Sequence, residues 1–215
     1  MMRRPGPAEG ANGVTVAPGG RILATANFDG TAGLWSFTNP AHPRRLGTIS
    51  SHSDYVNKVA FAADGDILAT ADSDGTVGLW NVTNPSRLRL LTALSRKADT
   101  VFGVAFAPQG RVLAVAEGDG TVRLWDLTDP TRPRHLATLT GETGEERGVA
   151  FAPDGHILAT ASFDHTAGLW DVGWLVRRGP RDLIDRACVV AGGGLSRAMW
   201  TARAVGLPYQ PTCPD

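Results

Sequence analysis

Short apolar runs alternate with polar turn sequences along most of the chain. Between residues 59 and 91 the apolar runs predict four short strands, at residues 59–62, 67–71, 76–80 and 88–91. Asp74-Gly75 separates the second run from the third and is a strong hairpin signal. Asn84-Pro85 interrupts the chain before the fourth run, because proline cannot donate to a central strand ladder. Four short strands in about 45 residues are typical of one β-propeller blade.

The same pattern occurs four times with a constant period of 45 residues. Equivalent positions hold Val14, Val59, Val104 and Val149; Leu23, Leu68, Leu113 and Leu158; Asp29, Asp74, Asp119 and Asp164; and Trp35, Trp80, Trp125 and Trp170. No insertion or deletion disturbs this spacing. A fixed period of this length indicates a tandem array of supersecondary units.

The period predicts four repeats, at residues 14–58, 59–103, 104–148 and 149–172. Residues 1–13 are rich in proline and glycine and have no strand pattern, so we expect a flexible N-terminal segment. Residues 173–215 differ in composition and are expected to form a separate tail. The predicted fold class is therefore all-β, with a short helical C-terminal tail.

Each repeat contains a Leu-Trp pair, and the last two repeats have the complete tripeptides Leu124-Trp125-Asp126 and Leu169-Trp170-Asp171. Together with the Asp-Gly-Thr turns and the Val-Ala-Phe strands, these motifs make the chain resemble the WD40-repeat family over residues 14–171. The resemblance implies a WD40-type β-propeller, either partial or four-bladed. It says almost nothing about function, because propellers serve many functions.

In WD40 repeats a His, a Ser or Thr, the turn Asp and the Trp form a buried hydrogen-bonded network. The resemblance implies this network for His52, Thr70, Asp74 and Trp80 of the second repeat. Other repeats depart from it at Pro7 in the first, Lys97 and Val115 in the third, and Glu142 in the fourth. We therefore expect blades of uneven stability, since each missing buried hydrogen bond is worth about 1 kcal/mol.

The array is expected to be incomplete as a ring. In the 45-residue register, Met1 falls near the end of a fourth strand, and Gly173-Trp174-Leu175 replaces the linker that leads to the fourth strand of the last repeat. Four blades are the lower limit of known propellers. The sequence leaves open a fragment of a longer array, a four-blade closure or open arc, and a homodimer that completes the propeller.

The tail contains a helical apolar stripe at residues 181–191 and ends in a proline-rich segment. It resembles the terminal segment of large bacterial multidomain WD40 proteins at Arg186-Ala187-Cys188, residues 194–197, Trp200 and residues 207–209. Ala198 and Met199 depart from that segment. The likeness gives an alternative function: a stand-alone C-terminal sensor or regulatory fragment of an NTPase-type regulator that assembles with a separate catalytic chain. The sequence has no Gly-x-x-x-x-Gly-Lys phosphate-binding loop.

Charge and hydropathy narrow the classes of partner. Lys plus Arg and Asp plus Glu each number 21, so nucleic-acid binding through bulk positive charge is not expected. No apolar run approaches the roughly 18 residues of a membrane span, and no secretory signal is evident, so we expect a cytoplasmic protein without membrane contact. The two cysteines, Cys188 and Cys213, are either bonded or buried as small apolar side chains.

No catalytic or metal-binding constellation stands out in the sequence. The five histidines share no metal-ligand spacing with the cysteines. The nearest catalytic-type set is His52 with Thr70 and Asp74, which the family resemblance assigns to blade packing. We therefore expect a protein that is not an enzyme and has no cofactor or metal.

Loops on the rim of a rigid propeller are the best candidates for recognition. The candidate partner-binding residues are Phe28, Tyr55, Asn57, Phe102, Arg147 and Phe163. They stand just before the turn aspartates or in the loops that enter the first strand of a repeat, positions that line one face of WD40 rings. Aromatic and arginine side chains are enriched at binding hot spots, although packing between blades is a competing interpretation. The leading hypothesis is a non-catalytic protein–protein interaction scaffold.

Overall fold

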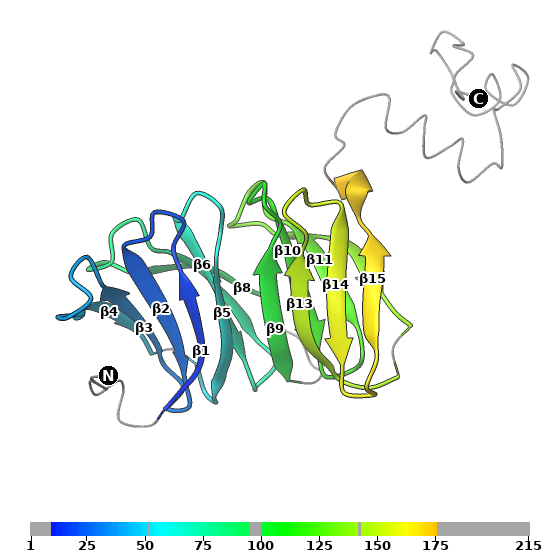
Figure 1. Cartoon of the computed structure of the whole chain (residues 1–215), viewed down its shortest axis with the longest axis horizontal. Helices are drawn as coiled ribbons and strands as arrows, with labels where there is room; N and C mark the ends of the chain where they lie inside the picture. The colour runs from blue at the N-terminus through cyan, green and yellow to red at the C-terminus, as the bar shows by residue number, and fades with distance from the viewer. Residues whose placement is uncertain (1–9, 51, 95–99, 142, 176–215) are drawn as a thin grey trace, which may run out of the picture. The chain divides into compact units, whose positions relative to one another are not determined.

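The computed structural model describes residues 10–50, 52–94, 100–141 and 143–175 (Figure 1). The chain divides into two compact units, Met1–Val172 and Gly173–Asp215. The described residues of the second unit form one 3-10 turn, Gly173–Leu175. The helices predicted for the tail, and both cysteines, lie outside the described residues. Among the residues that are described, no helix has the length and apolar character needed to cross a membrane.

In the described residues of the first unit, fifteen strands form four antiparallel sheets, one for each repeat. The first sheet contains β1 (Ala11–Val16), β2 (Ile22–Asn27), β3 (Ala32–Ser36) and β4 (Arg44–Ile49). The second contains β5 (Val56–Phe61), β6 (Ile67–Asp72), β7 (Val77–Asn81) and β8 (Arg89–Leu94). The third contains β9 (Val101–Phe106), β10 (Val112–Glu117), β11 (Val122–Asp126) and β12 (Arg134–Leu139). The fourth contains β13 (Glu146–Phe151), β14 (Ile157–Ser162) and β15 (Ala167–Asp171). The predicted all-β fold with propeller-type blades is confirmed.

The first strand of each sheet starts earlier than the apolar pattern predicts. β5 begins at Val56, which pairs with Asp72, and the register then shifts between Val56 and Lys58. β1 begins at Ala11, so residues 11–13 of the segment expected to be flexible belong to a strand. A β-bulge and backbone pairing extend a strand through polar residues, where side-chain alternation gives no signal.

The four sheets follow one another in chain order. Their first strands, β1, β5, β9 and β13, lie side by side as neighbours (Figure 1). Comparable packing between β1 and β13 does not occur among the described residues. The described sheets therefore form an open array with two free ends.

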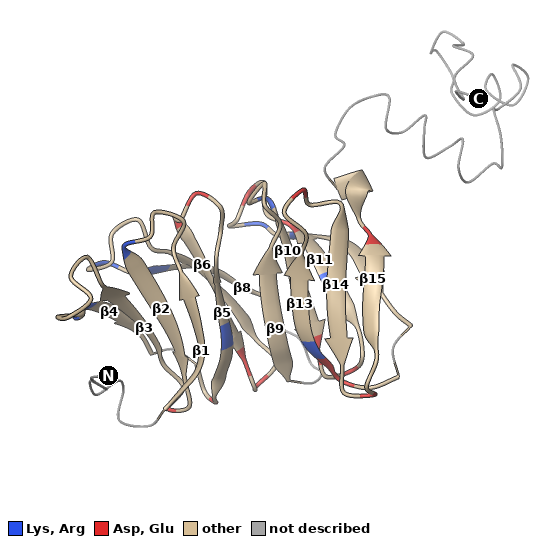
Figure 2. Ribbon diagram, viewed as in Figure 1, with Lys and Arg blue, Asp and Glu red and all other residues tan. Residues whose placement is uncertain are grey.

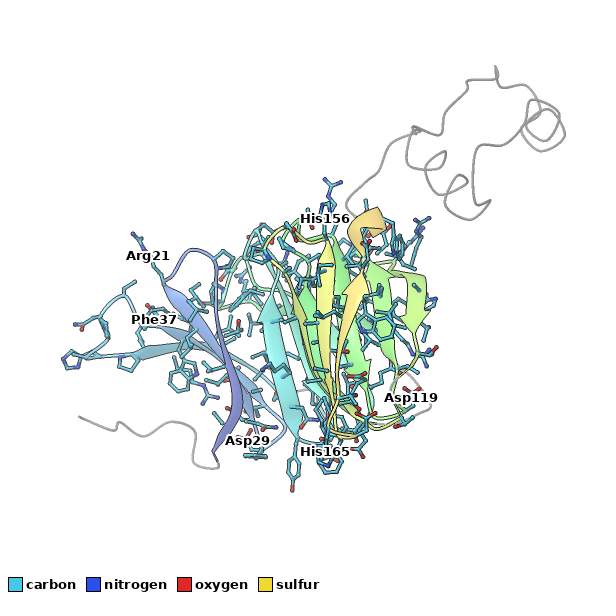
Figure 3. The ribbon with its side chains drawn as sticks, turned by 45° about the vertical axis from the view of Figure 1, so that its right-hand side comes forward. Arg21, Asp29, Phe37, Asp119, His156 and His165 are labelled. Atoms are coloured by element: carbon cyan, nitrogen blue, oxygen red, sulfur yellow. The ribbon has the colours of Figure 1, made fainter. Side chains whose placement is uncertain are left out.

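The turns between the second and third strands of each sheet all lie at one end of the sheets. We call this end the turn rim; its turns are residues 28–31, 73–76, 118–121 and 163–166. Asp29, Asp119 and His165 mark it in Figure 3, at the end opposite Arg21 and His156. The loops that lead into β5 and β13 reach the same rim, because an antiparallel first strand starts where the second strand ends.

Candidate partner-binding rim

The turn aspartates are fixed by hydrogen bonds within their own turns. Asp29 Oδ1 accepts from the backbone N–H of Thr31 at 3.0 Å and from its hydroxyl at 2.6 Å. The same pair of bonds occurs at Asp74, Asp119 and Asp164. Their position at every turn therefore follows from turn formation, as in other Asx-type turns.

Phe28 and Tyr55 form an exposed aromatic pair on the turn rim. Their ring centroids are 5.6 Å apart and their planes make an angle of 85°, an edge-to-face arrangement. Phe28 is 43% exposed and Tyr55 is 52% exposed. The two rings therefore contact each other across adjacent sheets and keep about half of their surface exposed.

A shallow pocket of about 200 Å³ opens beside this aromatic pair. Its lining consists of Phe28, Asp29, Gly30, His52, Ser53, Asp54 and Tyr55. The lining thus combines two aromatic rings with two carboxylates. Such a set suits a cationic side chain, which gains from both charge and ring contacts.

Asn57 has a different environment, since its amide holds neighbouring sheets together. Its Nδ2 donates to Ser73 Oγ at 2.9 Å and to the Val101 carbonyl at 3.0 Å. Its Oδ1 accepts from Asn12 Nδ2 at 3.1 Å. Asn57 therefore contacts residues of the first, second and third sheets, and these bonds serve the scaffold.

The other three candidates lie together between the third and fourth sheets. The guanidinium carbon of Arg147 is 4.0 Å from the ring centroid of Phe102 and 5.0 Å from that of Phe163. Arg147 Nη2 also donates to Glu145 Oε2 at 2.5 Å. Phe163 is 65% exposed and stacks on His165 with centroids 6.4 Å apart. The site thus has two clusters: the aromatic pair, and an arginine cluster of Phe102, Glu145, Arg147, Phe163 and His165.

Sequence reasoning missed Glu145 and His165 as members of the arginine cluster. Aligning the repeats by their 45-residue period could have identified both residues. Glu145 occupies the position of Tyr55, and His165 occupies the turn position held by glycine in the other repeats. His165 adopts a positive φ of 71°.

Charged residues lie mainly in the loops and at strand ends, while the central parts of the strands contain few (Figure 2). The pKa values of the Asp74, Asp119 and Asp164 carboxyls lie below the usual range. For Asp164, the Thr166 hydroxyl contributes most, followed by the Thr143 backbone N–H. For Asp74, partial burial acts to raise the pKa, but hydrogen bonds from Ser53 and Thr76 outweigh it. These rim carboxylates are therefore ionised at neutral pH.

Beneath the rim, the second sheet contains the buried polar network implied for it, with one correction. His52 Nε2 lies 2.6 Å from Thr70 Oγ1, and Trp80 Nε1 donates to the same oxygen at 3.1 Å. The carboxylate that contacts His52 is Asp72, at 2.8 Å from Nδ1, and not Asp74. Asp74 stands on the exposed turn, where it accepts from Ser53 and Thr76. Burial raises the pKa of the Asp72 carboxyl, partly offset by the Asp74 N–H and by His52.

In the third sheet, three charged side chains, Arg123, Glu117 and Asp119, take the place of this network. Val115 stands where Thr70 stands in the second sheet, and Arg123 stands where Gly78 stands. Arg123 Nε donates to Glu117 Oε2 at 2.8 Å, and its Nη2 donates to Asp119 at 3.2 Å. Glu117 is only 4% exposed. The remaining positions that depart from the network, Pro7, Lys97 and Glu142, lie outside the described residues.

The described residues contain no group of three or more His, Cys, Asp or Glu side chains that could hold a metal ion. The described part of the rim offers aromatic rings, carboxylates and the guanidinium group of Arg147. This chemistry suits noncovalent recognition of a polypeptide surface.

Comparison with known proteins identifies the repeat. The family model described as WD domain, G-beta repeat, matches residues 43–81, 88–126 and 133–171. Each match starts before the fourth strand of one sheet and ends with the third strand of the next, as from β4 to β7. A search of curated proteins found no match.

Proposed function

Because the chain belongs to the WD40-repeat family, we propose that it is a non-catalytic scaffold that docks a protein partner through the turn rim. WD40 repeats generally mediate protein–protein interactions, and proteins with these repeats are typically non-catalytic. The docking residues of this proposal are Phe28, Tyr55, Phe102, Arg147 and Phe163. Asn57 is left out of the contact set, because its amide bonds to neighbouring sheets.

The single observation that carries the proposal is the exposed edge-to-face pair of Phe28 and Tyr55 beside an open pocket. Exposed aromatic side chains on a rigid frame lose little conformational entropy on binding and bury a large area. The pair comes from two adjacent sheets, so its spacing is set by sheet packing. A preorganised pair of this kind is typical of an interface anchor.

The pocket chemistry supports a partner segment with a basic side chain. Asp29 and Asp54 line the pocket together with the two aromatic rings. We propose that a lysine or arginine of the partner enters this pocket, while apolar partner residues contact Phe163. Binding by such a charge pair should weaken as ionic strength rises, because exposed charges are screened within about 10 Å at 0.1 M salt.

The experiment is a capture and affinity comparison with four versions of the full chain. Crosslinking in lysate of the native host identifies a partner with the wild-type chain, and affinities for the purified partner are then measured. We expect Phe28→Ala and Phe163→Ala each to weaken binding about tenfold or more. Leu90→Ala is the matched control, because Leu90 is 45% exposed and lies on β8, away from the turn rim. Normal binding by both phenylalanine variants would show that the rim is not the docking surface.

Three further proposals concern the class of partner, a second copy of the chain and the alternative function. Zero net charge supports a protein partner over nucleic acid, and we place the scaffold in the cytoplasm without membrane contact. We also propose a second copy of the chain as a partner that completes the propeller. The alternative function, a regulatory fragment that assembles with a catalytic chain, is distinguished by its partner: crosslinking would then recover a chain with a nucleotide-binding or catalytic region.

A further inference from the structure

The sheet-to-sheet interfaces inside the chain follow one pattern. In the first interface, residues of the second, third and fourth strands of one sheet pack on the next sheet. The buried cluster there contains Ala24, Ala26, Ala32, Leu34 and Ile49 from the first sheet and Val56, Val59, Leu68, Trp80 and Val82 from the second. The cluster between the second and third sheets repeats it 45 residues later, with Ala69, Ala71, Val77 and Leu79 against Val101, Val104, Leu113, Val115 and Leu127. We call the face of a sheet that carries the equivalents of Ala26 and Leu34 its donor face. The opposite face, which carries the equivalents of Val59 and Leu68, is its acceptor face.

The fourth sheet presents its donor face uncovered. Leu169 is 77% exposed, whereas its equivalents Leu34, Leu79 and Leu124 are all 0% exposed. Ala161 and Ala167, on the same face, are also exposed. The residues that are buried at three sheet-to-sheet interfaces are therefore exposed on the fourth sheet, the last of the described sheets.

The first sheet presents its acceptor face uncovered. Val14 is 60% exposed, whereas Val59 and Val104 are 2% and 3% exposed. Val16, two residues further along the same face of β1, is 51% exposed. Leu23 and Trp35 are half-buried, although the equivalent Leu68 and Trp80 are buried. The two free ends are therefore the two complementary halves of one interface.

We propose that the donor face of the fourth sheet, around Leu169, docks on the acceptor face of the first sheet, around Val14, of a second copy of this chain. The argument is continuity: the contact reproduces the interface already present between consecutive sheets. Two copies joined in this way at both ends bring together eight sheets, within the range of closed propellers. Head-to-tail contacts of this kind give a ring when the rotation closes.

This inference deepens the second-copy proposal above and does not depend on docking at the turn rim. Its test is the solution mass of the full chain, measured by light scattering under reducing conditions over a range of concentrations. The expected mass is twice the chain mass of 22.7 kDa. A monomer at all concentrations would overturn the inference and assign these faces to other segments or partners.

Charged substitutions on each face give the second arm of the test. Leu169→Asp and Val14→Asp should each halve the mass, while Leu90→Asp, an exposed position on neither face, should leave the dimer intact. Far-ultraviolet circular dichroism checks that each variant remains folded, as expected for substitutions at exposed positions. A dimer unaffected by either face variant would overturn the proposed contact.

Mixing the two face variants tests the head-to-tail direction. A mixture of L169D and V14D chains retains one unaltered interface, between the Leu169 of the second variant and the Val14 of the first. We therefore expect the mixture to form dimers that neither variant forms alone. If V14D alone stays dimeric while L169D is monomeric, the fourth sheets pair with each other and the proposal is wrong. The rim proposal fails alone if the rim variants capture the partner normally while the wild-type chain is a dimer. The present inference fails alone if the rim variants lose the partner while the wild-type chain is a monomer.

Discussion

His52 Nδ1 lies 2.8 Å from Asp72 Oδ2, and the two side chains are only 4% and 0% exposed. The other ring nitrogen of His52 contacts Thr70, which also accepts a hydrogen bond from Trp80. One imidazole therefore links the loop before β5 to the strands β6 and β7. This arrangement stabilises the part of the second sheet that supports Ser53, Asp54 and Tyr55 on the rim.

Removing the imidazole should destabilise the protein more than changing the turn carboxylate. His52→Leu leaves the buried Asp72 carboxylate without its imidazole partner, and loss of one member of a buried pair costs about 3 kcal/mol. Asp74→Asn keeps the Oδ1 acceptor for Thr76 but loses the Oδ2 acceptor for Ser53 at an exposed turn, and it should cost about 1 kcal/mol. Urea unfolding of both variants measures the difference. An equal or larger loss in Asp74→Asn would restore Asp74 as the carboxylate of the network.

The strand alternation already contained the signal for Asp72. Thr70 and Asp72 are two residues apart on β6, so their side chains share one face, while Asp74 falls in the turn beyond the strand. The 45-residue period predicted the sheets themselves, since each repeat supplies the same turns and apolar runs. The family motif alone pointed to the wrong carboxylate, because it specifies residue types and not which side of a strand each residue occupies.

Contacts between sheets were harder to predict from the sequence. Asn12 bonds to Asn57, and Phe102 packs on Arg147, so both pairs join equivalent positions of neighbouring first strands. This relationship requires knowing that β1, β5, β9 and β13 lie side by side. The contact between Phe163 and Arg147 is different, because both residues belong to the fourth sheet and β13 pairs with β14 so that Glu146 lies opposite Ser162.

The third sheet should depend on Arg123 in a way that the other sheets do not. Arg123→Gly introduces the residue found at the equivalent positions Gly33, Gly78 and Gly168, but it leaves Glu117 buried without its guanidinium partner. We expect a loss of about 3 kcal/mol in the free energy of unfolding. Arg21→Gly, an exposed control, should change it by less than about 1 kcal/mol. Adding Glu117→Gln to the Arg123→Gly chain should recover part of the loss, and no recovery would argue against the lost Arg123–Glu117 contact as the cause.

Acid should destabilise the protein partly through Asp164. Hydrogen bonds from Thr166 and from the Thr143 N–H lower the pKa of this carboxyl in the folded protein below its usual 3.8. A lowered folded-state pKa means that the unfolded chain binds protons first, so stability is present above about pH 4 and is lost as the pH falls below it. Asp164→Asn should therefore give a shallower loss of unfolding free energy between pH 5 and 3, as measured by urea titration at each pH. Identical pH slopes in the variant and the wild type would contradict this assignment.

His165 should carry a backbone penalty that glycine would remove. Its φ of 71° lies in the left-handed region, and the equivalent residues Gly30, Gly75 and Gly120 have φ values of 76°, 85° and 78°. A non-glycine residue in this conformation costs about 1 kcal/mol, so His165→Gly should raise the free energy of unfolding by about 0.5–1 kcal/mol, despite the lost stacking on Phe163. His165→Ala keeps the Cβ and removes the ring, so it should not stabilise the protein. Equal stabilisation by the alanine and glycine variants, in urea unfolding, would show that the imidazole and not the backbone conformation is the source of the penalty.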